Sequence, residues 1–174
     1  DSGKVSDIVD GMMWAVGFVV SNVDGSQIPI NPNPAQVISM SLSGVGLCSR
    51  PLQDAINIAV GNDVIVVVAA GNNQVDIKTT YPANCDNVIS VAAKGPTGKL
   101  AYYSNFGNTT ITASGGDRTI LSPLSMVKST TWSSLEAYQL PSAGGQGIWT
   151  EMQGTSMATP HVSAAIAVLI SVLK

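Results

Sequence analysis

Two short apolar runs limit what this chain can fold into more than any other feature. Residues 64–70 read VIVVVAA and residues 88–93 read VISVAA. A continuous, β-branched run of this length is typical of a strand that is buried on both faces of a parallel sheet. A third strand, VISMSL, is expected at residues 37–42. The chain therefore predicts a parallel sheet whose two faces are both covered.

Helical patterns alternate with these strands. Apolar residues recur near helical spacing over residues 5–20, and a second helix is expected from Pro51 to about Gly61. Weaker strand signals lie at residues 110–113 and 148–152. Strand–helix alternation favours right-handed βαβ units, with helices on both faces of a mostly parallel sheet. We find no repeat or linker that divides the 174 residues, so we predict one three-layer α/β domain, or part of one.

The charge content narrows the class of protein. Only 11% of the residues are charged and the net charge is −3. Low charge with abundant small polar residues is typical of a compact secreted domain, whereas a nucleic-acid or anionic-membrane surface would need a basic patch. The apolar run at residues 162–173 is too short to span a membrane. We therefore expect neither a nucleic acid nor a membrane as partner.

The strongest motif, GTSMATPHV, occupies residues 154–162 and precedes an apolar run of helical length. Gly154 permits a tight turn, Thr155 is a natural N-cap, and Ser156 would then lie in the first turn of a helix. A hydroxyl placed there faces the positive end of the helix dipole and unpaired backbone N–H groups. This suits a serine nucleophile whose substrate oxygen becomes negative, although a Thr-Ser pair alone is usually only a helix cap.

Three loops are predicted at the edge of the sheet where ligands bind in parallel α/β folds. The segment SLSG at residues 41–44 ends the first strand, and its small residues leave the backbone open to an extended peptide. The segment AAGN at residues 69–72 ends the second strand, where Asn72 can present an amide N–H₂ group. The segment TYPA at residues 80–83 approaches the third strand. Each segment alone also fits an ordinary turn or strand end.

Together with GTSMATPHV, and in this order, these segments resemble the subtilisin-like serine peptidases, also called subtilases or peptidase family S8. The resemblance covers nearly the whole chain. It implies the subtilisin-like fold, a Ser156 nucleophile, and an oxyanion hole formed by Asn72 and the Ser156 N–H. The substrate-binding residues that it implies are Ser41, Leu42, Ser43, Gly44, Ala69, Ala70, Gly71, Tyr81 and Pro82. Ser43 replaces a usual Gly, and Ser114-Gly115-Gly116 stands where relatives often have Ala-Pro-Gly.

The general base of such an enzyme is not predicted within this chain. The single histidine, His161, follows Ser156 by five residues, a rotation of roughly 140° on a helix, so the two side chains point apart. In subtilases the catalytic Asp and His precede the segments matched here. We therefore expect residues 1–174 to be the C-terminal portion of a peptidase S8 catalytic domain, with a sheet incomplete at its N-terminal side. The upstream portion would be a partner, and a chain that begins at Asp1 without Met would be processed or shortened.

Cys48 and Cys85 lie in separate predicted loops and are separated by 37 positions. A disulfide between them would contribute about 4 kcal/mol in the chain-entropy model and would fit an extracellular or periplasmic location. Two buried reduced thiols are the alternative. The family resemblance favours the disulfide, since its bacterial extracellular branch often has a bridge here. No ligand spacing predicts a metal site, and Ca²⁺ is expected only by analogy with the family.

Two other interpretations of the chain stay open. The first is a scaffold or peptide-binding domain that keeps the fold but lacks a base. The second is an unrelated α/β hydrolase, which lacks support because Thr159-Pro160 replaces the Gly of the G-x-S-x-G elbow. Without its upstream portion the chain should also expose sheet edge or core. We therefore expect it to associate with itself or with a complementary N-terminal segment.

Overall fold

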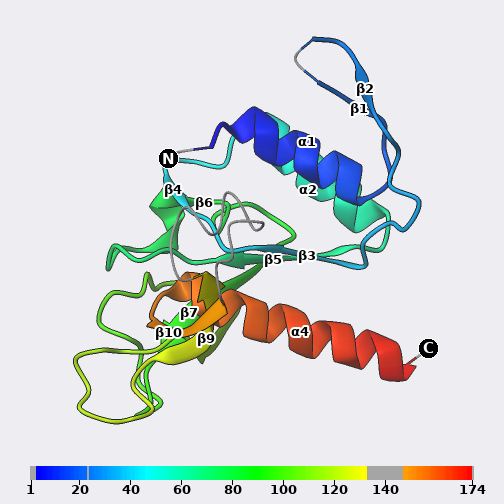
Figure 1. Cartoon of the computed structure of the whole chain (residues 1–174). Coiled ribbons are helices and arrows are strands. Elements are labelled where there is room, and N and C mark those ends of the chain that lie inside the picture. The colour runs from blue at the N-terminus through cyan, green and yellow to red at the C-terminus, as the bar shows by residue number, and fades with distance from the viewer. Residues whose placement is uncertain (1–2, 23, 133–146, 174) are drawn as a thin grey trace.

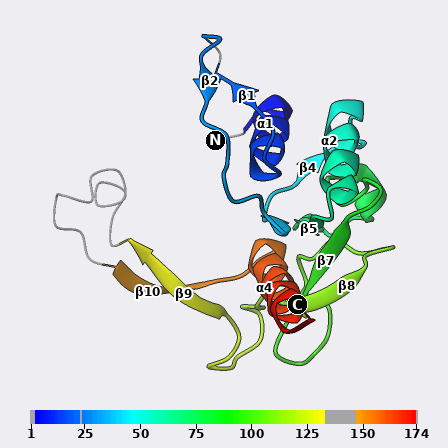
Figure 2. The same cartoon turned by 90° about the vertical axis from the view of Figure 1, so that its right-hand side faces the viewer.

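The computed structural model describes residues 3–22, 24–132 and 147–173. Its central element is a four-stranded parallel sheet in the order β3-β5-β7-β8. The strands are β3 (Val37–Met40), β5 (Ile65–Ala69), β7 (Ile89–Lys94) and β8 (Ile111–Ser114). Helices α1 (Val5–Ala15) and α2 (Arg50–Gly61) lie on one side of it, and α4 (Thr155–Leu173) lies on the other (Figures 1 and 2). The three-layer α/β fold predicted from the sequence is confirmed.

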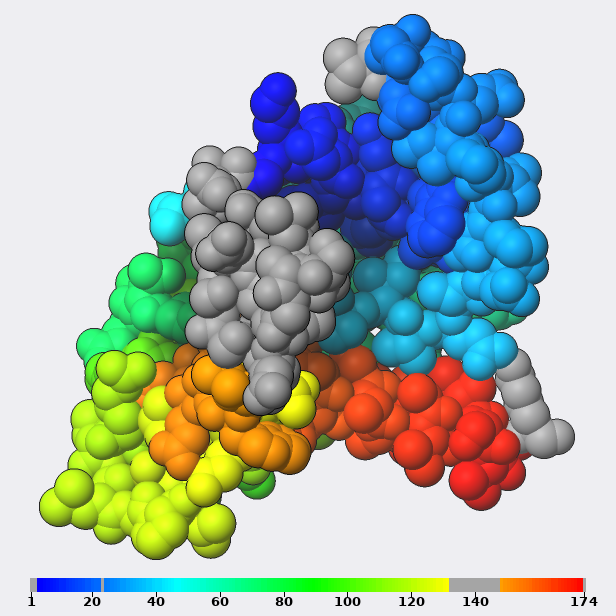
Figure 3. All heavy atoms as spheres, viewed as in Figure 1, coloured from blue at the N-terminus to red at the C-terminus, as the bar shows by residue number. Residues whose placement is uncertain are grey.

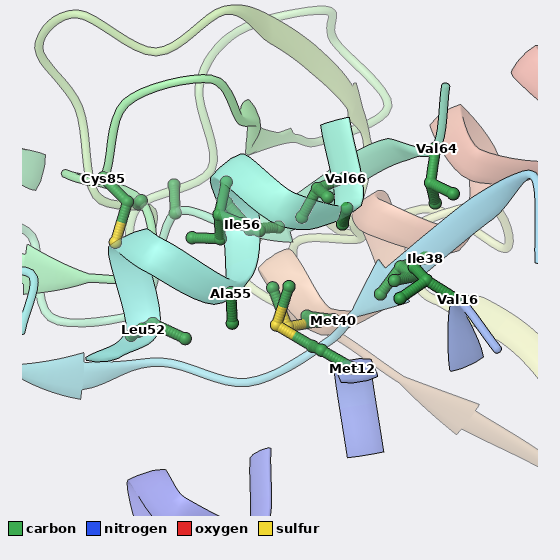
Figure 4. Packing of buried hydrophobic residues seen from close by; sticks show 14 of the residues in the cluster. Met12, Val16, Ile38, Met40, Leu52, Ala55, Ile56, Val64, Val66 and Cys85 are labelled. Carbon is green, nitrogen blue, oxygen red and sulfur yellow. The ribbon is translucent and has the colours of Figure 1, made fainter. Parts of the chain in front are cut away.

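The alternation of side chains along β5 divides the core into two clusters. Val66 and Val68 point to the side of α1 and α2, where they pack with Ile56 and Met12 (Figure 4). Val67 belongs to the other cluster, which faces α4. The members of that second cluster are Val67, Val91, Ala93, Ala101, Tyr103, Ala158 and Val162. This two-sided burial explains why the strand reads as one continuous apolar run instead of an alternating pattern.

Three short antiparallel pairs surround the sheet. They are β1 (Val20–Ser21) with β2 (Gln27–Ile28), β4 (Gly44–Val45) with β6 (Thr80–Tyr81), and β9 (Val127–Trp132) with β10 (Gly147–Met152). A 3-10 turn, η1 (Ile77–Thr79), leads into β6. The β9–β10 hairpin extends away from the three layers before the chain enters α4 (Figure 2).

Several boundaries differ from the sequence predictions. The first helix ends at Ala15 and not near residue 20, because Gly17 takes a positive φ of 92° and Val20 belongs to a strand. The first sheet strand stops at Met40, which frees residues 41 and 42 from the ladder. Strand β9 is not predicted, because its sequence VKSTTW is mostly polar and has little apolar alternation. A polar, Gly-rich segment at residues 142–153 precedes the GTSMATPHV motif, and its residues 142–146 lie outside the described residues.

The predicted disulfide is confirmed. Cys48 and Cys85 are bonded, with their Cα atoms 5.2 Å apart. Cys48 precedes α2, and Cys85 follows β6 in a turn that packs against the core on the same side of the sheet. The bridge therefore fastens the start of α2 to the loop between β6 and β7.

Helix α4 is buried at its start and open at its end. Thr155, Ala158 and Val162 are buried against the sheet, whereas Val172 and Leu173 are 76% and 84% exposed. Figure 3 shows this C-terminal half at the surface of the molecule. In the part of the chain that the structure describes, α4 alone is long and apolar enough to cross a membrane, by length and composition only. The sequence prediction of a run too short to span a membrane counted only residues 162–173, whereas the helix has 19 residues. Its buried residues all lie in its first half: Thr155, Ala158, Thr159, Val162 and Ser163.

Candidate active site

The site forms where α4 begins, beside the carboxyl ends of β3 and β5. Gly154 has a φ of 150° and its carbonyl accepts the N–H groups of Met157 and Ala158. Gly154 therefore occupies the N-cap position, directly before the first helical residue. The prediction that Thr155 is the N-cap is wrong, because Thr155 is the first helical residue. Ser156 lies in the first turn, as predicted, close to the positive end of the helix dipole.

Ser156 is joined to the end of β3 by two hydrogen bonds. Its hydroxyl Oγ donates to the backbone carbonyl of Ser41 at 3.0 Å. In return, Oγ of Ser41 donates to the backbone carbonyl of Ser156 at 2.8 Å. The two predicted site residues therefore meet across 115 positions of sequence. A further bond, from Ser163 Oγ to Ser39 Oγ at 2.8 Å, ties the next turns of α4 to β3.

Asn72 is oriented by the residue that precedes Ser156. Its side-chain oxygen Oδ1 accepts from the backbone N–H of Thr155 at 2.9 Å and from the Thr155 hydroxyl at 3.0 Å. The same hydroxyl accepts the N–H of Gly71 at 3.1 Å. Gly71 has a φ of 101°, a conformation that a side chain would strain. Among the residues that the structure describes, both hydrogen bonds of the Asn72 amide end at Oδ1, and Nδ2 donates to none of them.

The predicted substrate-binding segments lie near Ser156 and Asn72. Ala69 and Ala70 are buried at the end of β5, while Leu42 and Ser43 are exposed after β3. Gly44 pairs with Tyr81 across β4 and β6. The Tyr81 ring lies directly over the Gly44 Cα, where a Cβ would overlap it. The structure thus brings the three segments to one edge of the molecule, with Pro82 buried behind Tyr81.

His161 is exposed, and its Nδ1 is 2.7 Å from the carbonyl of Met157, one turn back in α4. Since a carbonyl can only accept, Nδ1 carries the proton in this contact. His161 and Ser156 line the same surface pocket of about 350 Å³. However, the Ser156 hydroxyl is bonded to Ser41, and none of its bonds reaches a His, Asp or Glu among the described residues. That His161 is not the base therefore stays a prediction.

A buried tyrosine supports the chain just before Ser156. The hydroxyl of Tyr103 lies 2.8 Å and 2.7 Å from the carbonyls of Gly115 and Gly116, to which it donates. The N–H of Gly154 donates to the same Gly115 carbonyl. Burial, helped by the nearby Asp117 carboxylate, raises the pKa of Tyr103 to about 12, although the N–H of Gly154 acts in the opposite direction.

Asp117 is itself buried and hydrogen-bonded. Burial raises the pKa of its carboxyl group, but hydrogen bonds from the Thr119 hydroxyl, the Thr119 N–H and the Tyr102 N–H outweigh burial, so the pKa lies below the ordinary value. The carboxylate holds the turn that follows Gly116. Across residues 3–22, 24–132 and 147–173, no three His, Cys, Asp or Glu side chains cluster as metal ligands. Binding of calcium thus stays an expectation from the family resemblance.

Three residues shape the site in ways that the sequence does not predict. Thr155 is predicted only as a cap, and neither Tyr103 nor Asn105 is predicted to have a role. Thr155 lies inside the strongest motif, so a further role of its hydroxyl could have been suspected. Tyr103 and Asn105 carry no local signal, because the partners of their side chains lie at least 12 positions away along the chain.

Comparison with known proteins adds to this geometry. The chain is 44% identical over 170 residues to an extracellular protease of Xanthomonas campestris. It is 40% identical over 169 residues to an extracellular basic protease of Dichelobacter nodosus. These matches cover 98% and 97% of this chain but only 26% and 25% of the two relatives. The chain therefore spans about a quarter of the length of these curated relatives.

Solved structures give the same result for the fold. A protease from Pseudoalteromonas arctica is 42% identical, with a TM-score of 0.80 over 93% of this chain and 45% of the other. A cold-adapted subtilisin-like serine proteinase is 25% identical, with a TM-score of 0.70 over 98% of this chain and 49% of the other. The profile of the subtilase family, peptidase family S8, matches residues 1–174. Because that match covers the whole chain, this protein belongs to the subtilase family.

Proposed function

We propose that the protein containing this chain is a serine endopeptidase in which Ser156 Oγ attacks the scissile carbonyl. The oxyanion that forms would accept hydrogen bonds from the Ser156 N–H and from Nδ2 of Asn72. The observation that carries the proposal is the link between Asn72 and Thr155. It anchors the amide oxygen at Thr155, and Nδ2 lies 3.5 Å from the point where a Cβ on Gly154 would stand, beside the start of α4.

The proposal places the general base and its orienting carboxylate upstream of Asp1, so that residues 1–174 form the C-terminal portion of the catalytic domain. A serine nucleophile needs such a base within hydrogen-bond reach. The pocket of about 350 Å³ beside Ser156 offers room for it, between α4 and the start of β9. The partial coverage of the relatives supports further chain outside residues 1–174, and the open face of α4 supports a segment that packs there.

The substrates would be polypeptides in extended conformation. Residues 41–43 leave the sheet ladder after Met40, so their backbone groups can pair with a peptide that lies alongside them. Gly44 and Tyr81 would bound the adjacent pocket together with Ala69 and Ala70. The names of the two bacterial relatives and the Cys48–Cys85 disulfide support a secreted enzyme, extracellular or periplasmic.

The decisive test is labelling of Ser156 by a fluorophosphonate, read by intact mass and peptide mapping. The reagent should be applied to the full-length gene product, to residues 1–174 alone, and to a Ser156→Ala variant. We expect labelling at Ser156 in the full-length protein only. Labelling of residues 1–174 alone would mean that a base lies within this chain.

An inactive scaffold is the second candidate, favoured by the lack of a base on Ser156 among the described residues. It predicts that peptides bind to the full-length protein without labelling or turnover. Absence of labelling in a folded full-length protein would replace the peptidase proposal with this one.

A further inference from the structure

Asn105 lies beneath the loop that carries Asn72, and it is 0% exposed. Its Nδ2 group donates to the carbonyl of Ala70 at 2.8 Å and to the hydroxyl of Thr80 at 3.1 Å. Its Oδ1 accepts the N–H groups of Asn73 at 2.9 Å and Val75 at 3.2 Å. A carboxamide has two N–H donors and two acceptor sites, so all of its hydrogen-bonding capacity is used.

These bonds reach two of the predicted substrate-binding segments, at residues 69–72 and 80–83. Ala70 and Asn73 flank the turn formed by Gly71 and Asn72, whereas Thr80 opens β6 and precedes Tyr81. One side chain therefore ties the oxyanion loop to the strand that faces Gly44.

The contact with the turn itself is close. The backbone N–H of Asn105 donates to the carbonyl of Gly71 at 2.9 Å. A Cβ placed on Gly71 would lie 2.5 Å from Nδ2 of Asn105, so the turn and the amide fit together only because residue 71 is glycine. Thr155 holds the same turn from the opposite side, through Gly71 and Asn72. The turn is clamped between α4 and Asn105.

We propose that Asn105 is a positioning residue for the peptidase reaction, acting through Asn72 and through strand β6 (Thr80–Tyr81). The proposal rests on the proposed function, because it assumes that Asn72 donates to the oxyanion. Asn105 has no exposed surface and so touches no substrate itself. Its action is to fix where Nδ2 of Asn72 points when charge develops, and displacements of about 1 Å at such a donor cost on the order of 100-fold in rate.

The test is a double-mutant cycle in the full-length protein, with kcat and KM measured on a peptide amide substrate. We expect Asn105→Ala to lower kcat by about 10- to 100-fold relative to the parent. In an Asn72→Ala background the same change should lower kcat by less than about twofold, because the donor that it positions is already gone. A purely structural role would lower kcat by the same factor in both backgrounds.

Ser90→Ala is the matched control. Ser90 is buried and exchanges hydrogen bonds with Thr110 near the opposite end of β7, away from Asn72. Its small effect should be equal in the two backgrounds. If Asn105→Ala does not fold, Thr80→Val serves in its place, since it keeps the shape and removes one acceptor of the Asn105 amide. We expect it to lower kcat by about two- to tenfold, and only when Asn72 is present.

The outcomes separate the two proposals. A full-length protein without peptidase activity overturns both of them. An active parent in which Asn105→Ala or Thr80→Val leaves kcat unchanged, or acts equally with and without Asn72, overturns the positioning role alone.

Discussion

Pro160 occupies the position in α4 whose backbone N–H would ordinarily donate to the carbonyl of Ser156, but proline has no N–H. The carbonyl of Ser156 therefore loses its ordinary helical partner, four residues ahead. It accepts the Ser41 hydroxyl at 2.8 Å instead. A proline that weakens the helix locally thus frees the acceptor that attaches the candidate nucleophile to the sheet.

This relationship predicts coupling between positions 41 and 160. Ser41→Ala leaves the Ser156 carbonyl without a donor and should reduce the free energy of unfolding by about 0.5–1.5 kcal/mol. In a Pro160→Ala background the restored N–H can satisfy that carbonyl, so Ser41→Ala should cost clearly less. Denaturant unfolding of the four full-length variants measures the difference. Equal costs in both backgrounds would show that the serine hydroxyl and the proline are independent.

Removal of the Asn72 side chain should reduce turnover without weakening substrate binding. We expect Asn72→Ala to lower kcat by about 100- to 1000-fold with KM nearly unchanged, a value measured on a subtilisin and carried over to this chain. Asn73→Ala is the control, because that side chain is exposed and only its backbone N–H bonds to Asn105. Steady-state kinetics on a peptide amide checks both variants. A rise in KM with kcat preserved would assign Asn72 to substrate binding and not to the oxyanion.

The disulfide should contribute stability that a reductant removes. Replacing Cys48 and Cys85 together by Ser removes the cross-link between residues 37 positions apart. In the chain-entropy model this should reduce the free energy of unfolding by about 4 kcal/mol. Thermal unfolding with and without dithiothreitol measures this. The parent should lose stability on reduction and the double Ser variant should not. A reductant effect of the same size in both proteins would contradict the prediction.

The raised pKa of Tyr103 predicts that the folded protein loses stability at high pH. Its pKa is raised from 10.0 to about 12 in the folded protein, so the folded state holds the phenol proton more tightly than the unfolded chain does. The associated stability is complete below pH 10 and falls as the pH rises towards 12, by about 2–3 kcal/mol in total. Unfolding curves of the parent and of Tyr103→Phe should therefore converge over this range. Parallel curves would show that the phenol does not titrate in that way.

The exposed half of α4 should make residues 1–174 associate when isolated. Leu169 and Val172 are 59% and 76% exposed on an apolar helix face. Light scattering should show oligomers of the isolated chain, and Leu169→Lys with Val172→Lys should reduce them. The control is Thr97→Lys with Asn108→Lys, which adds the same charge at exposed positions outside the helix and should leave the oligomers unchanged. A monomeric parent at high concentration would contradict the prediction.

The sequence was informative wherever the signal was local. The runs at residues 64–70 and 88–93 predicted β5 and β7 because burial on both faces demands continuous apolar residues. The motif at 154–162 placed Ser156 in the first turn of a helix, as observed. Strand β9 escaped prediction because it pairs with β10 as a hairpin outside the core, where polar side chains are tolerated.

The support of the site could not be predicted in the same way. Thr155 bonds to residues more than 80 positions away, and Asn105 bonds to residues 25 to 35 positions away. The order of the strands in the sheet determines which of these residues come into contact. Neither the composition nor the periodicity of the sequence predicts that order. Resemblance to a family supplied the roles of Ser156 and Asn72, but not the side chains that hold them.

The bond between Asn72 and Thr155 also bears on motion. Thr155 hydrogen-bonds to Asn72 and is covalently joined to Ser156. We therefore expect a displacement of α4 to move the Ser156 hydroxyl and the Asn72 amide together. Thermal motion of the layers should then change the separation of the two groups little. The proposed nucleophile and the proposed oxyanion donor are therefore expected to keep their alignment while the outer parts of the molecule fluctuate.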